Sequence, residues 1–493
     1  MMTHRILLSV VILCTTVAAP ASNVSVANKT LPNIVLILAD DLGYGDAACF
    51  NPQSKVPTPS IDRLAREGMR FTKAYAPDAV CTPSRYALWT GRYSWRTHLR
   101  RSVQLNWEKP LIDEGRLTVP LLLKQAGYKT AGFGKWHLGA EFPTIDGLPP
   151  VGQGGQRHEL DGANLDLKLP MRGGPMARGF DRWFGFICAS ESFVYDDLFA
   201  TAYIDVYARP KARGAEALRH IPLANYLPEL TEKAIDFIHT NASEAKAGKP
   251  FFLHFSPYVP HIPLAIDPSF KGRTRAGDYG DYVHQLDHEI GRLLTTLDQQ
   301  GLTNDTLVIL LSDNGSHFEV TGEGHRPNGE LRGTKATIYE AGVRVPFIAR
   351  WPGHIGADTT SNELVASADL LATMSSLTRK PLSENAGEDS FDLLPILLGK
   401  PGVRTTREFV VVKSAAAQLA IREGRWKYIA PLNFPWASAP ASGLGEAYLY
   451  DLEADPGEKI NLVTVNGDVA EAMRNKLLLA VNASGTHPRS LRK

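Results

Sequence analysis

The sequence predicts an α/β fold, with a large, mostly parallel sheet flanked by helices and a smaller C-terminal antiparallel α+β domain. Two observations support this. Short apolar runs at 33–40, 129–133, 251–255 and 306–313, the first of them β-branched, are typical of strands buried on both faces. Helical patterns that stop at glycine alternate with these runs, as in a parallel sheet covered by helices.

Three helices are expected between the strands. Ser60 is the expected cap of a helix that stops at Gly68. A second helix is expected over 118–126, before Gly127. A third and longer one is expected over 282–300, where leucines, isoleucine and valine recur on one face.

The pattern changes after about residue 380. Short strand-like pieces follow at 408–412, 418–422 and 426–429, then a turn-rich stretch over 434–445 and a helix near 469–481. We therefore expect a large domain over 22–380 and a C-terminal subdomain over 381–493.

The N-terminus has the pattern of a signal peptide over residues 1–21. A basic start precedes an apolar stretch shorter than the roughly 20 residues that a membrane span needs, and a small-residue cleavage pattern follows. The alternative is a retained membrane anchor. With the peptide removed, we expect a secreted or periplasmic protein, or a lysosomal one in a eukaryote, with no membrane span in the mature chain.

Bulk composition excludes several classes of protein. The chain has 493 residues, 44% of them hydrophobic and 21% charged, which is ordinary for a globular protein and argues against disorder. A formal net charge of +1 supplies no general attraction for nucleic acid. The mature chain keeps Cys49, Cys81 and Cys188, and an odd number leaves at least one cysteine unpaired.

Acidic and amide side chains follow two similar predicted strands. Asp40 and Asp41 come after the first run, and Asp313 and Asn314 come after the run at 306–313. Ligands bind beyond the carboxyl ends of strands in open parallel sheets, and all-oxygen sites suit hard cations such as Ca²⁺ or Mg²⁺. The alternative for either pair alone is an ordinary turn.

Basic side chains follow the two other predicted strands. Lys135 and His137 come after 129–133, and His261 follows 251–255 between prolines that stiffen its backbone. Either histidine could be a positioned acid or base. The alternative is a structural histidine held by hydrogen bonds.

The segment 81–85, Cys-Thr-Pro-Ser-Arg, is the most informative. Pro83 suits the first position of a helix, which would place Cys81 at a helix N-terminus that favours anions, with Arg85 one turn further on. From these residues alone, Cys81 is either a nucleophile of lowered pKa or a buried structural cysteine.

This segment resembles the signature of the type I, formylglycine-dependent sulfatases, which are relatives of alkaline phosphatase. Their Cys-x-Pro-Ser-Arg motif is followed shortly by Thr-Gly-Arg, found here at 90–92. Further matches lie at 39–43, 134–139, 179–181, 260–261, 312–315, 332–335, 340–342, 449–452 and 455–456. The resemblance implies an alkaline phosphatase-like fold and a sulfuric ester hydrolase that releases inorganic sulfate.

The resemblance also implies two cofactors. A separate maturation enzyme would oxidise Cys81 to formylglycine (3-oxoalanine), whose hydrated aldehyde offers one hydroxyl to attack sulfur and a second to expel sulfate afterwards. A divalent metal, Ca²⁺ or alternatively Mg²⁺, would activate the attacking hydroxyl. The implied metal ligands are Asp40, Asp41, modified Cys81, Asp313 and Asn314.

The remaining roles also come from the resemblance. Arg85 would hold the formylglycine and offset charge near the metal. Lys135 and Lys335 would bind sulfate oxygens. His137 would act as the base that releases sulfate. His261 would bind substrate and protonate the leaving oxygen, with Lys335 as a second candidate for that proton.

The resemblance favours a sulfated glycan such as 6-O-sulfated N-acetylgalactosamine. The basic and aromatic segment 89–101 could bind sulfates and stack on sugars, or could be structural. The alternatives are a small aryl sulfate, or a phosphodiesterase or phosphonate hydrolase that also uses formylglycine. A cysteine phosphatase needs Cys-x5-Arg, whereas the spacing here is Cys-x3-Arg. A non-catalytic relative would have lost Cys81 or a metal carboxylate.

Overall fold

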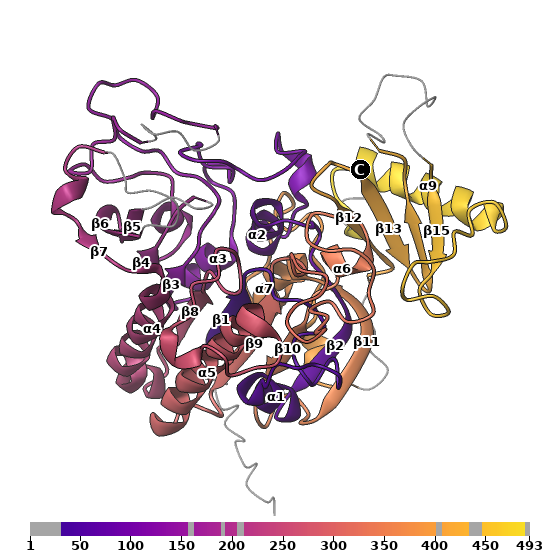
Figure 1. Ribbon diagram of the computed structural model, residues 1–493, viewed down its shortest axis with the longest axis horizontal. Helices are drawn as coiled ribbons and strands as arrows, with labels where there is room; N and C mark the ends of the chain where they lie inside the picture. Colours follow the sequence, from indigo (N-terminus) through magenta and orange to yellow (C-terminus); the bar gives the residue numbers. More distant parts are fainter. Residues whose placement is uncertain are drawn as a thin grey trace, which may run out of the picture.

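A computed structural model describes residues 31–155, 162–188, 193–204, 212–400, 407–432 and 446–488 (Figure 1). The predicted signal peptide and the turn-rich stretch at 434–445 lie outside the described residues. In the part of the chain that the structure describes, no helix is both long and apolar enough to cross a membrane.

The predicted large sheet is present and has eleven strands within the described residues, in the order β11-β2-β10-β9-β1-β8-β3-β4-β5-β6-β7. The strands are β1 (Asn33–Ala39), β2 (Met69–Tyr75), β3 (Lys129–Gly134), β4 (Arg182–Gly185), β5 (Phe193–Asp196), β6 (Phe199–Tyr203), β7 (Arg219–His220), β8 (Phe251–Ser256), β9 (Thr306–Ser312), β10 (Phe347–Arg350) and β11 (Thr359–Ala366). Its centre, β9-β1-β8-β3, is parallel throughout and consists of the four predicted strands.

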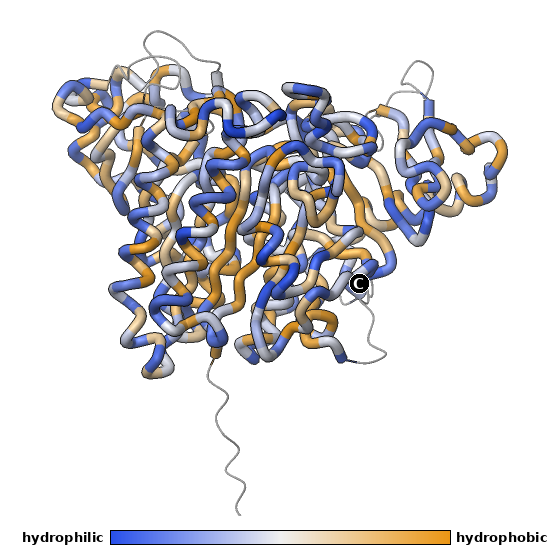
Figure 2. The backbone as a smooth tube through the Cα atoms, turned by 60° about the horizontal axis from the view of Figure 1, so that its bottom comes forward, coloured by the Kyte–Doolittle hydropathy of each residue, from blue (hydrophilic) through white to orange (hydrophobic). Residues whose placement is uncertain are grey.

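Helices cover both faces of this sheet. They are α1 (Pro59–Arg66), α2 (Cys81–Thr90), α3 (Val119–Gln125), α4 (Leu223–Lys246), α5 (Gly277–Gln299), α6 (Glu340–Val343), α7 (Leu370–Thr378) and α8 (Leu394–Leu397). In β1, Leu36 packs into the cluster shared with α2, α3 and α7, whereas Ile37 packs into the cluster shared with α1, α4 and α5. Figure 2 shows the hydrophobic strands running between helices of alternating hydropathy. Burial on both faces explains why the strands are continuous apolar runs.

Three predicted helix starts need correction. Helix α1 begins at Pro59 with Thr58 as its N-cap, and the backbone N–H of Ser60 donates to the buried carboxylate of Asp287, so a side chain from α5 satisfies this end. Helix α5 begins at Gly277, five residues before the predicted start. Helix α2 begins at Cys81, so Pro83 occupies its third position rather than its first.

The chain continues into a separate four-stranded antiparallel sheet, in the order β12-β13-β14-β15. Its strands are β12 (Phe409–Lys413), β13 (Leu419–Glu423), β14 (Trp426–Ile429) and β15 (Tyr448–Asp451), and α9 (Gly467–Asn482) packs on it. Figure 1 shows this unit on the right, away from β4–β7. The antiparallel C-terminal unit is therefore confirmed, while the boundary at residue 380 stays a prediction.

The small sheet contacts the segment that leads into α2. Lys413 at the end of β12 forms an ion pair with Asp78 at 2.8 Å, and both side chains are fully buried. The backbone N–H of Ala79 donates to Lys413 O at 2.9 Å, and that of Ala336 donates to Ala79 O at 2.8 Å. The C-terminal sheet therefore supports both the start of α2 and the loop that carries Lys335.

We expect Lys413→Met to lower the urea midpoint of unfolding, because it leaves the Asp78 carboxylate buried without its partner. Breaking such a pair costs about 3–5 kcal/mol. Lys476→Met is the matched control, since Lys476 pairs with Glu423 and both are about one-third exposed. A partly exposed pair contributes about 0–1 kcal/mol. Equal midpoints for the two variants would show that the buried pair does not stabilise this junction.

Candidate active site

The four central strands bring the predicted polar residues to one edge of the sheet. Because β9, β1, β8 and β3 are adjacent and parallel, their carboxyl ends lie side by side. The residues that follow them are Asp313 and Asn314 after β9, Asp40 and Asp41 after β1, His261 after β8, and Lys135 and His137 after β3. Residues far apart in the sequence thus form one cluster.

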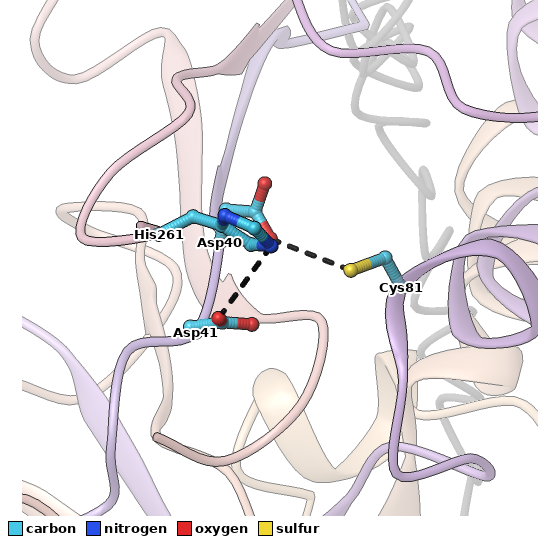
Figure 3. Close-up of side chains that lie close together, drawn as sticks. All are labelled: Asp40, Asp41, Cys81 and His261. Carbon is cyan, nitrogen blue, oxygen red and sulfur yellow. Dashed lines mark hydrogen bonds and ion pairs between the residues drawn. The ribbon is translucent and has the colours of Figure 1, made fainter. Parts of the chain in front are cut away.

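Cys81 faces this cluster from the first residue of α2 (Figure 3). Its Sγ lies 3.6 Å from Asp40 Oδ1. Potential ligand atoms of Asp40, Asp41, Cys81 and His261 all lie within 4.8 Å of one another. Burial raises the pKa of the Cys81 thiol, but the charges of Lys135 and Lys335 outweigh burial and lower that pKa to about 7. The thiol thus lies in surroundings that favour a negative charge.

Arg85, one turn along α2, contacts residues from several parts of the cluster. Its Nε donates to Asp313 Oδ2 at 3.0 Å, and its Nη2 forms ion pairs with the same oxygen at 2.8 Å and with Asp40 Oδ2 at 3.7 Å. Its Nη1 donates to Lys135 O at 2.9 Å and to Ser256 Oγ at 2.8 Å. Only a guanidinium presents this many donors in a fixed plane, so a lysine could not replace these contacts.

Two lysines compensate the two aspartates after β1. Lys135 Nζ lies 2.7 Å from Asp40 Oδ2, and Lys335 Nζ lies 2.7 Å from Asp41 Oδ1. Burial raises the pKa of Asp40, but Lys135, His261 and Arg85 outweigh it and hold that pKa well below its usual value. The Asp40 carboxylate is therefore ionised at neutral pH.

The donor set fits a divalent cation. Asn314 Nδ2 donates to Asp41 Oδ1 at 2.7 Å, which leaves Asn314 Oδ1 buried and without a hydrogen-bond partner among the described residues. Such a buried orphan oxygen needs a partner. Burial and the charge of Asp40 also raise the pKa of Asp313 well above its usual value. A hard cation would satisfy the orphan oxygen and relieve the crowding of carboxylates.

The pKa values of the two histidines shift in opposite directions. His137 Nε2 donates to Gln104 O at 3.0 Å, so its Nδ1 carries a free lone pair, and that atom has no partner among the described residues. Burial and the charge of Lys135 hold the pKa of His137 well below its usual value, so its imidazole is neutral. His261 Nδ1 donates to Ile262 O, which leaves Nε2 facing Asp41 Oδ2 at 3.8 Å. Burial lowers the pKa of His261, but Asp41 outweighs burial and raises it.

The site opens to solvent at two of its side chains. Lys135 and His137 are buried, whereas His261 and Lys335 keep 16% and 13% of their side chains exposed. His261 and Lys335 therefore form the accessible side of the cluster, and Cys81 is buried beneath the surface.

The structure decides between the two alternatives for the aromatic residues of segment 89–101. Trp89 lies in the core edge-to-face with His254, and Tyr93 and Trp95 are also buried. Arg96 forms an ion pair with Asp389 at 2.8 Å. These aromatic rings cannot stack on a sugar, so the structural alternative is correct for them.

Sequence reasoning also missed Ser256. Its hydroxyl accepts a hydrogen bond from Arg85 at 2.8 Å, and it is the last residue of β8. Its position at the carboxyl end of a predicted strand was the available signal. Serine is common in ordinary turns at such positions, so a single serine there does not indicate a function.

Comparisons with known proteins agree on one family. Residues 32–380 match the family model described as Sulfatase. The chain is 34% identical over 489 residues to an N-acetylgalactosamine-6-O-sulfatase of Bacteroides thetaiotaomicron, covering 91% of this chain and 93% of the relative. It is 35% identical over 480 residues to human arylsulfatase A, covering 92% and 87%.

A solved structure is also similar over almost the whole chain. It was described in work on the metabolism of multiple glycosaminoglycans by Bacteroides thetaiotaomicron. It superimposes with a TM-score of 0.77 at 31% identity, covering 92% of this chain and 99% of that one.

Proposed function

Because this chain belongs to the sulfatase family and is a sulfuric ester hydrolase, we propose that it releases sulfate from a sulfated carbohydrate bearing 6-O-sulfated N-acetylgalactosamine. The main support for the mechanism is the position of Cys81 at the N-terminus of α2. Its Sγ lies beside Asp40, and the charges of Lys135 and Lys335 lower the pKa of its thiol. The substrate is supported by the bacterial N-acetylgalactosamine-6-O-sulfatase, which is similar over nearly its whole length.

Membership of the family implies a formylglycine and a divalent metal ion. We propose that a maturation enzyme makes the formylglycine from Cys81 and that the metal is Ca²⁺, with Mg²⁺ as the alternative. Asp40, Asp41, Asp313, Asn314 and modified Cys81 would hold it. The metal would lower the pKa of the attacking hydroxyl, and the hydrated aldehyde would provide two hydroxyls on one carbon.

In this proposal, two lysines and an arginine provide the positive charges that bind the sulfate group and orient the formylglycine. Lys135 and Lys335 point at the carboxylates beside Cys81, so their ammonium groups are placed to bind sulfate oxygens as charge shifts from sulfur to the leaving oxygen. Arg85 contacts Asp313, Lys135 and Ser256 at once, and so orients the formylglycine at its own helix terminus.

The two histidines suit opposite proton transfers. His137 is neutral with a free Nδ1, which suits the base that removes a proton from the second hydroxyl and so expels sulfate. His261 has a raised pKa and an Nε2 that faces the site, which suits the acid that protonates the leaving oxygen. Its place at the open side of the site agrees with this role, because the sugar must extend toward solvent.

We further propose that the protein is exported, with residues 1–21 removed as a signal peptide, and is secreted or periplasmic, or lysosomal in a eukaryote. Its partners would then be the glycan substrate and the maturation enzyme. A second candidate substrate is a small aryl sulfate, favoured by the 35% identity to human arylsulfatase A.

The first test is sulfate release from a panel of sulfated saccharides, followed by ion chromatography. The enzyme is produced with a maturation partner, and formylglycine at position 81 is confirmed by mass spectrometry. We expect release from 6-O-sulfated galactosamine units and none from Cys81→Ala, which should keep the wild-type melting curve. No release from any saccharide by converted enzyme overturns the glycan substrate, and aryl sulfates, then phosphodiesters and phosphonate esters, are tested next.

Asp313→Ala should lose both bound metal and activity, because it removes a ligand and leaves Arg85 buried without its main partner. Metal content by inductively coupled plasma mass spectrometry provides a readout independent of turnover. A full metal complement in this variant would show that the proposed ligand set is incorrect.

His261→Ala should slow the hydrolysis of sugar sulfates much more than that of activated aryl sulfates. A good leaving group needs no proton, whereas general acid catalysis contributes roughly 10²–10⁴-fold for a poor one. Steady-state kinetics on one substrate of each kind measure the difference. Equal losses on both substrates would argue against His261 as the acid.

A further inference from the structure

A short segment, residues 325–328, connects the two loops that carry the proposed metal ligands, and all of its residues except Arg326 are buried. The first loop follows β1 and spans 40–46, and the second follows β9 and spans 313–318. His325 Nε2 lies 2.8 Å from Asp46 Oδ1 in the first loop. Asn328 Oδ1 accepts from the backbone N–H of Ser316 in the second loop at 3.0 Å. We call this segment the 325–328 clasp.

The contact with the first loop is centred on Asp46. Its fully buried Oδ2 accepts hydrogen bonds from the backbone N–H of Gly43 at 2.7 Å and from Tyr279 Oη at 2.6 Å, while Oδ1 faces His325. Tyr279 Oη also lies 3.4 Å from Asp41 O. The clasp thus reaches the backbone of a proposed ligand through two buried side chains.

The orientation of His325 is determined from both sides of its ring. The backbone N–H of Lys55 donates to His325 Nδ1 at 3.4 Å. Nδ1 is therefore the acceptor, and Nε2 carries the hydrogen that is donated to Asp46. The imidazole is almost wholly buried and is not part of the opening at His261 and Lys335. It therefore does not contact a substrate.

The backbone of the first loop requires such support. Asp41 has a φ of +69°, in the left-handed region that a non-glycine residue rarely adopts and that persists only when its surroundings enforce it. The loop and the clasp are also in backbone contact, because Gly45 N donates to Pro327 O at 2.6 Å. A Cβ on Gly43 would lie 2.2 Å from Pro327 O, so the close approach of the loop and the clasp requires a glycine at this position.

The second loop is held by the amide of Asn328. Besides accepting from Ser316 N, it donates through Nδ2 to Ser316 O at 3.3 Å and to Phe318 O at 3.4 Å. Ser316 is two residues after the proposed ligand Asn314. One segment therefore sets the positions of both ligand-bearing loops, although neither His325 nor Asn328 belongs to the proposed ligand set.

We propose that His325 and Asn328 are positioning residues that hold the two ligand loops at the separation a divalent cation needs, and so set the affinity for that cation. This inference rests on the metal site proposed above. Residues that orient metal ligands from outside typically change metal affinity roughly 10–100-fold when they are replaced.

The test measures calcium affinity of the formylglycine-bearing enzyme in calcium buffers, from the dependence of the thermal midpoint on free Ca²⁺. We expect His325→Leu and Asn328→Ala each to raise the half-saturating calcium concentration roughly 10–100-fold. His325→Gln, which restores a donor toward Asp46, should recover most of the affinity. Activity lost in His325→Leu should return at high calcium, which a merely structural defect would not allow.

Thr130→Val is the matched control. Thr130 is fully buried near the start of β3, and its hydroxyl donates to Gly179 O at 2.7 Å. This variant should lower the thermal midpoint and leave calcium affinity unchanged. Wild-type calcium affinity in Asn328→Ala and His325→Leu overturns the positioning role. If His325→Leu does not fold, Asn328→Ala decides the question. Wild-type enzyme without any response to Ca²⁺ or Mg²⁺ overturns the metal site itself, and the positioning role with it.

Discussion

The active site depends on a balance of buried charges. Asp40, Asp41 and Asp313 are buried within one cluster, and Arg85, Lys135 and Lys335 compensate them. Isolated charges at such a place would be prohibitively costly, and pairing with opposite charges offsets much of that cost. The pairing is specific, because each of the three cations lies closest to a different carboxylate. Removing any one of them leaves a specific partner uncompensated.

This balance explains why the reactive groups can be enclosed. Cys81, Lys135 and His137 lie beneath the surface, where electrostatic interactions are stronger than in water. The more exposed His261 and Lys335 form the opening. The depth of each side chain thus agrees with its proposed role, with sulfur chemistry at the bottom of the site and protonation of the leaving group near solvent.

Parts of the chain that carry no proposed catalytic residue hold this geometry. The small C-terminal sheet pairs Lys413 with Asp78, three residues before Cys81, and its contacts with Ala79 and Ala336 join the start of α2 to the Lys335 loop. A second buried network joins the small sheet to the large domain at α6. There Lys427 of β14 pairs with both Glu340 and Glu458, at 3.0 and 2.9 Å. The small sheet therefore packs against segments that position the active site of the large one.

The sequence alone determined the central strands, the small C-terminal sheet, the helix at Cys81 and the family, because these follow from local patterns: apolar runs, glycine stops and a specific motif. It did not indicate β2, β10 and β11 on one side of the centre of the large sheet, or the short strands β4–β7 on the other. Thr58, not Ser60, is the N-cap of α1, because Asp287 from a distant helix satisfies the backbone there. Only the tertiary structure decided that Trp89 and Tyr93 are core residues, that Ser256 supports Arg85, and that His325 and Asn328 connect the two ligand loops. The physical reason is that each of these depends on contacts between residues far apart in the chain, which no local pattern records.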